Sequence, residues 1–152
     1  MDLSKSKYII VELIPTSIKK ENGVIVQLSA LKLEGLKLLD RFDYRINEDK
    51  VPLSDFIEMC SYDKESFTYL DTTDEILDEF SKWSNDLPLL IIDNDYTNNY
   101  LKDIANIKES ILSYLKLDVT DDVIEKIISK YKLESSNYIV DLLYEALIQE
   151  ID

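Results

Sequence analysis

The feature that most constrains the fold is a run of mostly apolar residues near the start of the chain, at positions 8–14. The run is rich in β-branched side chains and contains one charged residue, Glu12. A run of this kind is typical of a strand in the middle of a sheet, with both faces covered. Pro15 is expected to end the strand, because proline has no N–H group to donate to a neighbouring strand.

Two further strands are predicted at short intervals after the first. Residues 24–32 are mostly apolar, and residues 36–46 alternate between apolar and charged side chains. The alternation predicts that one row of the third strand faces the core and the other faces water. The core row is Phe42, Tyr44 and Ile46, and the water row is Arg41, Asp43 and Arg45. The short connections predict that the three strands pair in an antiparallel meander.

The rest of the chain predicts one more strand and several helices. Residues 47–71 carry turn residues and short apolar pairs, and no regular element is predicted there. A helix is predicted from Thr72, which has capping-box spacing with Glu75. The short apolar run at 89–92 predicts a buried strand. Helical spacing of apolar residues predicts further helices over 100–115, over 120–131 and from about residue 137. No repeat or boundary divides this order, so we expect one domain over residues 1–152.

The composition excludes several kinds of chemistry. The chain has no histidine, which removes a histidine general base, a Ser-His-Asp triad and histidine-ligated zinc. The one cysteine, Cys60, cannot form an internal disulfide and is expected to be a buried, unreactive thiol. A lone cysteine fits the reducing cytoplasm, where we expect the protein to be. No apolar run approaches the roughly 18 residues of a membrane span, so no membrane partner is expected.

Charge is distributed unevenly along the chain. The net charge is −14, yet residues 1–45 hold eight Lys and Arg against six Asp and Glu. The negative charge therefore lies in the remainder of the chain, and it argues against broad attraction to nucleic acid or an anionic membrane. Two interpretations stay open. The acids are either solvated helix faces or an acidic surface for a basic partner, including a surface that imitates nucleic acid.

Several segments together resemble a known enzyme family. They are residues 8–17, 23–33, 61–66, 72–94 and 127–147. In this order they resemble the DEDD 3′–5′ exonucleases, the family of proofreading subunits and oligoribonucleases, over almost the whole chain. The resemblance implies an α/β, ribonuclease-H-like fold. Its mixed sheet would have three antiparallel strands and then a strand parallel to the first, flanked by helices.

The resemblance also implies where catalytic groups would lie. In the family, four carboxylates hold two divalent ions, which activate water and stabilise the leaving oxygen. The resemblance places Glu12 at the first carboxylate position, Ile14 at the second, Thr97 at the third and Asp141 at the fourth. Two of the four positions are therefore acidic. An isoleucine cannot ligate a hard cation, which takes oxygen ligands.

The residue that orients the attacking water also differs from the family pattern. A histidine or tyrosine does this work in the family. Ser136 stands at the histidine position and Asn137 at the tyrosine position, with Tyr138 one residue too late. The same resemblance that implies the fold therefore argues against the family's activity.

Asp93 and Asp95 lie close to the third carboxylate position. If the first and fourth predicted strands are adjacent, both could converge with Glu12 and Asp141 as a non-standard site for Mg²⁺ or Mn²⁺. Each acid also has a plainer interpretation. Glu12 would reach solvent or a backbone donor, Asp141 would be a surface acid at a helix edge, and the other two would cap turns or helices.

Three hypotheses follow, and the first is favoured. The chain is a catalytically inactive exonuclease-like domain that acts through a protein partner and needs no cofactor. Alternatively, it is a divergent metal-dependent nuclease or phosphodiesterase that uses Glu12, Asp141 and one of Asp93 or Asp95. The third hypothesis is an acidic inhibitor or nucleic-acid mimic. A nucleic-acid partner is implied only by the family resemblance.

Overall fold

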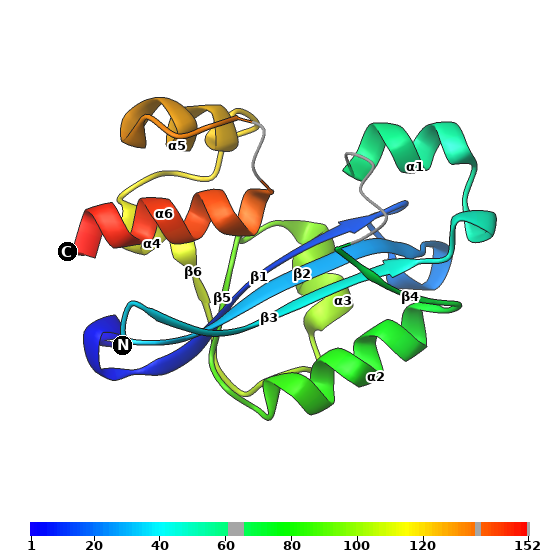
Figure 1. Ribbon diagram of the computed structural model, residues 1–152, viewed down its shortest axis with the longest axis horizontal. Coiled ribbons are helices and arrows are strands. Elements are labelled where there is room, and N and C mark those ends of the chain that lie inside the picture. The colour runs from blue at the N-terminus through cyan, green and yellow to red at the C-terminus, as the bar shows by residue number, and fades with distance from the viewer. Residues whose placement is uncertain (61–65, 136–137, 152) are drawn as a thin grey trace.

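The centre of the computed structural model is a six-stranded sheet in the order β4–β3–β2–β1–β5–β6 (Figure 1). Residues 1–60, 66–135 and 138–151 are described. The strands are β1 (Lys7–Pro15), β2 (Ile25–Glu34), β3 (Lys37–Ile46), β4 (Thr68–Leu70), β5 (Leu89–Ile91) and β6 (Lys108–Ser110). The helices are α1 (Leu53–Cys60), α2 (Thr73–Ser84), α3 (Asp95–Leu101), α4 (Ile111–Leu115), α5 (Val123–Tyr131) and α6 (Ile139–Ile151). Short 3₁₀ helices are η1 (Leu3–Lys5), η2 (Lys20–Asn22) and η3 (Glu48–Lys50).

The pairing of the strands confirms the predicted mixed sheet. β1 pairs with β2 and β2 with β3, both antiparallel, as the short connections predicted. β5 lies on the other side of β1 and runs parallel to it, with Ile9 opposite Leu89. The two short edge strands also pair in parallel, β4 with β3 and β6 with β5. The predicted strand at 89–92 is therefore adjacent to the first strand.

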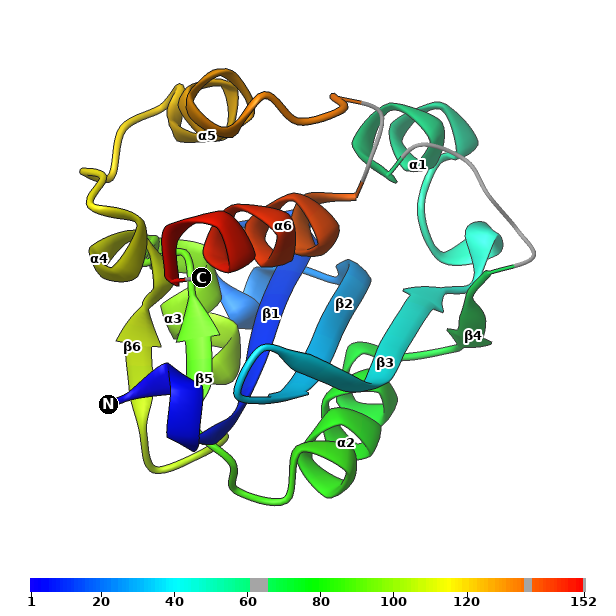
Figure 2. The same ribbon diagram turned by 60° about the vertical axis from the view of Figure 1, so that its left-hand side comes forward.

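Helices cover both faces of the sheet, which explains why β1 is apolar throughout (Figures 1 and 2). α2 and α3 lie on one face, whereas α4, α5 and α6 lie on the other. Side chains alternate between the two cores. Ile9 and Leu13 belong to the core under α2 and α3, whereas Tyr8 and Ile10 belong to the core under α4–α6. In the part of the chain that is described, no helix is long and apolar enough to cross a membrane.

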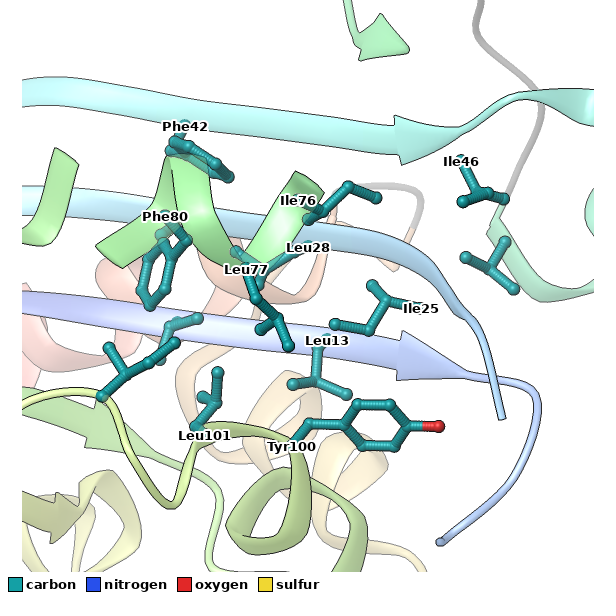
Figure 3. Close-up of a cluster of buried hydrophobic side chains, with 14 of the residues drawn as sticks. Leu13, Ile25, Leu28, Phe42, Ile46, Ile76, Leu77, Phe80, Tyr100 and Leu101 are labelled. Atoms are coloured by element: carbon teal, nitrogen blue, oxygen red, sulfur yellow. The ribbon is translucent and has the colours of Figure 1, made fainter. Parts of the chain in front are cut away.

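The helix predicted from Thr72 forms as the capping-box spacing indicated. Thr72 is the N-cap of α2, and its Oγ1 accepts a hydrogen bond of 3.1 Å from the backbone N–H of Glu75. The inward row of α2 consists of Ile76, Leu77 and Phe80, which point toward the sheet (Figure 3). This packing fixes α2 against β2 and β3.

The single long helix predicted over 100–115 is wrong. α3 ends at Leu101, the chain turns at Ala105 with φ +65°, and β6 then adds a strand to the edge of the sheet beside β5. A separate helix, α4, follows. The helical spacing of apolar residues gave a wrong prediction here, because residues 108–110 form backbone hydrogen bonds with β5 instead of continuing a helix.

Two further expectations are corrected between residues 41 and 71. The stretch expected to be irregular contains η3, α1 and β4 among its described residues. The water-facing row of β3 is also not exposed throughout. Arg45 is fully buried, because α1 and Phe67 cover that end of the sheet. In the core row, Phe42 and Ile46 are buried as predicted, and Tyr44 is half-buried.

Candidate functional site

The carboxyl ends of β1 and β5 meet at the same edge of the sheet, because the two strands run parallel. Glu12 lies near the end of β1, and Asn94 and Tyr96 follow β5. These three residues line a cavity of about 300 Å³, which we call the Glu12 cavity. Its other walls include the segment 119–121 before α5 and Ile139, the first residue of α6. The cavity thus gathers residues that are far apart in the sequence.

Glu12 is largely buried in this cavity and has no polar partner among the described residues. The residue is 8% exposed, and none of the described residues donates a hydrogen bond to it or forms an ion pair with it. Burial raises the pKa of the Glu12 carboxyl from 4.5 to about 8, because the charged form loses its hydration. The group is therefore mostly protonated at neutral pH. Of the plainer interpretation of Glu12, a backbone donor is not found among the described residues, and contact with solvent is limited to the 8% of the residue that stays exposed.

The other titratable groups around Glu12 are acidic or neutral. Tyr96 and Asp121 line the same cavity, and burial followed by the nearby Glu12 charge raises the pKa of Tyr96. Glu12 also lines a smaller cavity of about 120 Å³ together with Cys60 and Tyr138. Cys60 is buried as predicted, and burial raises the pKa of its thiol. This environment disfavours a second negative charge beside Glu12.

Asp141 is held by an arginine. It lies in the first turn of α6, and its two carboxylate oxygens accept hydrogen bonds of 2.7 and 3.2 Å from Nη1 and Nη2 of Arg41 on β3. The Nε of the same guanidinium donates to Asp43 at 3.2 Å. The arrangement is a bidentate pair between α6 and the sheet. Asp141 lines neither of the two cavities beside Glu12.

The residues after β5 serve mainly to begin α3. Asn94 is the N-cap, and its side-chain oxygen accepts a 2.9 Å hydrogen bond from the backbone N–H of Thr97. Asp93 accepts a 2.7 Å hydrogen bond from Asn98. Asp95 lies exposed in the first turn of α3, and Thr97 is buried. A helix cap does form in this segment, as expected, but the capping residue is Asn94 and not one of the two aspartates beside it.

The structure does not gather the four candidate carboxylates. Among the described residues, no three His, Cys, Asp or Glu side chains lie close enough together to hold a metal ion. Two apolar side chains lie beside Glu12 instead, Ile14 in the smaller cavity and Ile139 in both. The positions expected to orient water, Ser136 and Asn137, lie outside the described residues, as does the family-like segment 61–65.

Several residues of this region were not singled out in the sequence. Tyr96 lines both the Glu12 cavity and a third cavity of about 280 Å³, which Ile14 and Ile18 help to line. Ile18 and Val119 are 56% and 53% exposed, and they line the third cavity and the Glu12 cavity respectively. An isolated apolar residue in a polar loop is the only signal in the sequence that could have marked them.

A larger cavity of about 590 Å³ lies beside the edge strand β4, lined in part by Asn47, Tyr69 and Asp71. None of the four candidate carboxylates lines it. The chemistry predicted from the sequence therefore does not belong to this cavity.

Comparison with known proteins supports the fold. No family model and no curated protein sequence matches the chain. Among solved structures, the crystal structure of cell-death related nuclease 4 is similar, with a TM-score of 0.59 and 14% sequence identity. The match covers 97% of this chain and 63% of that one, so the chain spans less than two thirds of its neighbour's length. At this identity the likeness shows the fold alone, and it confirms the predicted exonuclease-like, ribonuclease-H-like α/β class.

Proposed function

We propose that the chain is an exonuclease-like domain that does not cleave nucleic acid and that acts by binding a protein partner. The observation that carries the proposal is the separation of its carboxylates. Asp141 is paired with Arg41, Asp93 accepts from Asn98, and Glu12 is the only one of the four candidate carboxylates that lines its cavity. Two-metal catalysis needs several carboxylates that converge on the same two ions. The described acids do not offer that convergence.

The immediate neighbours of Glu12 support the same conclusion. A divalent ion such as Mg²⁺ takes about six oxygen ligands. Ile14 and Ile139, which line the cavities beside Glu12, offer no side-chain oxygen as a ligand. The chain has no histidine that could deprotonate an attacking water. The divergent-nuclease hypothesis therefore depends on Glu12, on Asp141, which is paired with Arg41, and on Asp93 or the exposed Asp95.

A protein partner is supported by the surface around the cavities. Seven large apolar side chains are exposed among the described residues, and the two most exposed, Ile18 and Val119, each line a cavity that Tyr96 also lines. Exposed apolar residues that gather at concave surfaces are typical of protein-binding sites. The net charge of −14 disfavours nucleic acid as the partner.

Site-specific photo-cross-linking tests the binding surface. A photo-reactive phenylalanine analogue is placed at position 18 or 119 in cells of the source organism. Ile107 is the matched control, because it is 51% exposed but lines none of the cavities described above. We expect adducts of the same discrete mass from positions 18 and 119 and none of that mass from position 107. Identical adducts from all three positions, or none from the first two, would contradict the proposal.

A further inference from the structure

The Glu12 carboxyl group has lost most of its contact with water without gaining a partner among the described residues. The residue is 8% exposed and lines the Glu12 cavity, and no described residue bonds to it. Burying a polar group without a hydrogen bond costs on the order of 1–3 kcal/mol. A bound molecule with a suitable donor would remove that cost. The ionised form of Glu12 therefore lacks a hydrogen-bond donor among the described residues of the cavity.

The remaining lining determines which donor fits. Asp121 adds a second carboxylate at the rim, whereas no Lys or Arg is found among the described lining residues. The amide oxygen of Asn94 is already bonded to Thr97, so Glu12 is the buried acceptor that stays free. The lining also includes the apolar side chains of Ile92, Ile124 and Ile139. The cavity thus combines negative polarity with apolar walls.

We infer that the Glu12 cavity binds an organic cation, an ammonium or guanidinium group on an apolar stem, with the cationic head at Glu12. The inference rests on the part of the proposed function that leaves this cavity free of catalytic metal. The aromatic ring of Tyr96 is a further favourable surface for a cation. A cavity of about 300 Å³ matches the lower end of small-ligand sites, so the stem is short.

The same chemistry could come from two sources, a free amine or the Lys or Arg side chain of a protein partner. An anionic ligand is disfavoured, because it would meet Glu12 and Asp121 with no described cation in the lining. A neutral alcohol of the same shape fills the apolar space but lacks the charge. The comparison of an amine with its alcohol therefore isolates the inferred interaction.

Methyl NMR of the isoleucine side chains tests the inference. Isopentylamine and isopentanol, which have the same carbon skeleton, are titrated separately at a pH of about 8.5, where Glu12 is largely ionised and the amine is still protonated. The methyl signals of Ile92, Ile124 and Ile139 are followed. We expect the amine to shift these signals saturably and to bind at least about tenfold more tightly than the alcohol. In Glu12→Gln, which keeps the shape of the protonated carboxyl, we expect that ratio to fall below about threefold.

The controls separate this inference from the proposed function. Asp121→Asn, at the exposed rim, is expected to weaken the binding of isopentylamine a few-fold. Asp78→Asn, on helix α2 on the other face of the sheet, is expected to leave the affinity for isopentylamine unchanged. A lysine whose two termini are capped is titrated as well. If it binds like isopentylamine, the natural ligand is the side chain of a protein partner, whereas binding of isopentylamine alone identifies a free amine as the ligand.

Equal binding of the amine and the alcohol would overturn the inference, as would an amine-to-alcohol affinity ratio that Glu12→Gln leaves unchanged. Saturable Mg²⁺ shifts that Glu12→Gln abolishes would instead overturn the proposed function.

Discussion

Raising the pH from about 5 to about 9 is expected to lower the free energy of unfolding of the wild-type protein by about 3–5 kcal/mol more than that of Glu12→Gln. The cause is the buried Glu12 carboxyl, whose pKa is raised from 4.5 to about 8 in the folded protein. Glutamine has the same shape as the protonated acid but cannot ionise. The difference between the two proteins therefore isolates this one group.

The loss of stability at high pH follows from the difference in proton binding between the folded and the unfolded protein. Between pH 4.5 and about 8 the folded protein keeps the proton on Glu12, whereas the unfolded chain has released it. Stability from this group is fully present below pH 4.5 and is lost as the pH rises through about 8. The chain has no histidine, so few other groups titrate in this window.

Urea denaturation at a series of pH values measures the effect. Glu34→Gln is the matched control, because Glu34 is an exposed glutamate at the end of β2. We expect the control to follow the wild-type pH profile and Glu12→Gln to be the more stable protein above about pH 8. Parallel profiles for wild type and Glu12→Gln would show that the Glu12 carboxyl is hydrated or paired in solution.

Arg45→Ala is expected to lower the free energy of unfolding by about 3–5 kcal/mol. The side chain is fully buried. Its Nε donates to Gln27 at 2.9 Å, and Nη2 donates to the carbonyl oxygen of Cys60 at 2.5 Å. The guanidinium carbon lies 3.7 Å from the centroid of the Phe67 ring. Truncation would leave a cavity and unpaired polar groups where α1 joins the sheet.

Arg41 provides a matched control on the same strand. Its side chain is 38% exposed and pairs with Asp141 at the surface, so Arg41→Ala is expected to change stability by about 1 kcal/mol or less. Arg45→Met, which keeps an apolar stem, should fall between the two alanine variants. Denaturant unfolding of the three proteins gives the comparison. An Arg45→Ala loss no larger than that of Arg41→Ala would contradict the role assigned to the buried arginine.

The sequence was a good guide wherever apolar runs decide the structure. The run at 8–14 becomes β1 because both of its faces meet a core, and the run at 89–92 becomes β5 beside it for the same reason. Capping chemistry placed the start of α2. The neighbour among solved structures confirms the α/β class that the family resemblance implied.

The sequence failed where distant contacts decide the structure. β6 forms because it pairs with β5, and no local pattern in the sequence indicates an edge strand of three residues. Arg45 follows the alternation of a water-facing row, yet α1 and Phe67 cover it. These outcomes depend on tertiary packing that periodicity cannot register.

In the candidate site, too, a local sequence pattern found one residue, and a contact between distant residues was missed. The first-carboxylate position, Glu12, was found from its strand, and the structure places it in a cavity. The pairing of Asp141 with Arg41 spans 100 residues, and nothing in the local sequence of either residue indicates it. Asn94 was missed as the helix cap because the capping role was predicted for the aspartates on either side of it. A role in metal binding for Asp93 and Asp95 stays a prediction.

The central claim, that this chain does not cleave nucleic acid, is tested most directly by hydrolysis of a labelled single-stranded oligonucleotide with Mn²⁺. A pH of about 8.5 is chosen so that Glu12 is largely ionised and its protonation cannot explain a negative result. Wild type and Glu12→Gln are compared at equal concentration from parallel purifications. The account predicts that both proteins degrade the substrate no faster than buffer does. Shortening of the substrate by the wild type that Glu12→Gln abolishes would contradict it.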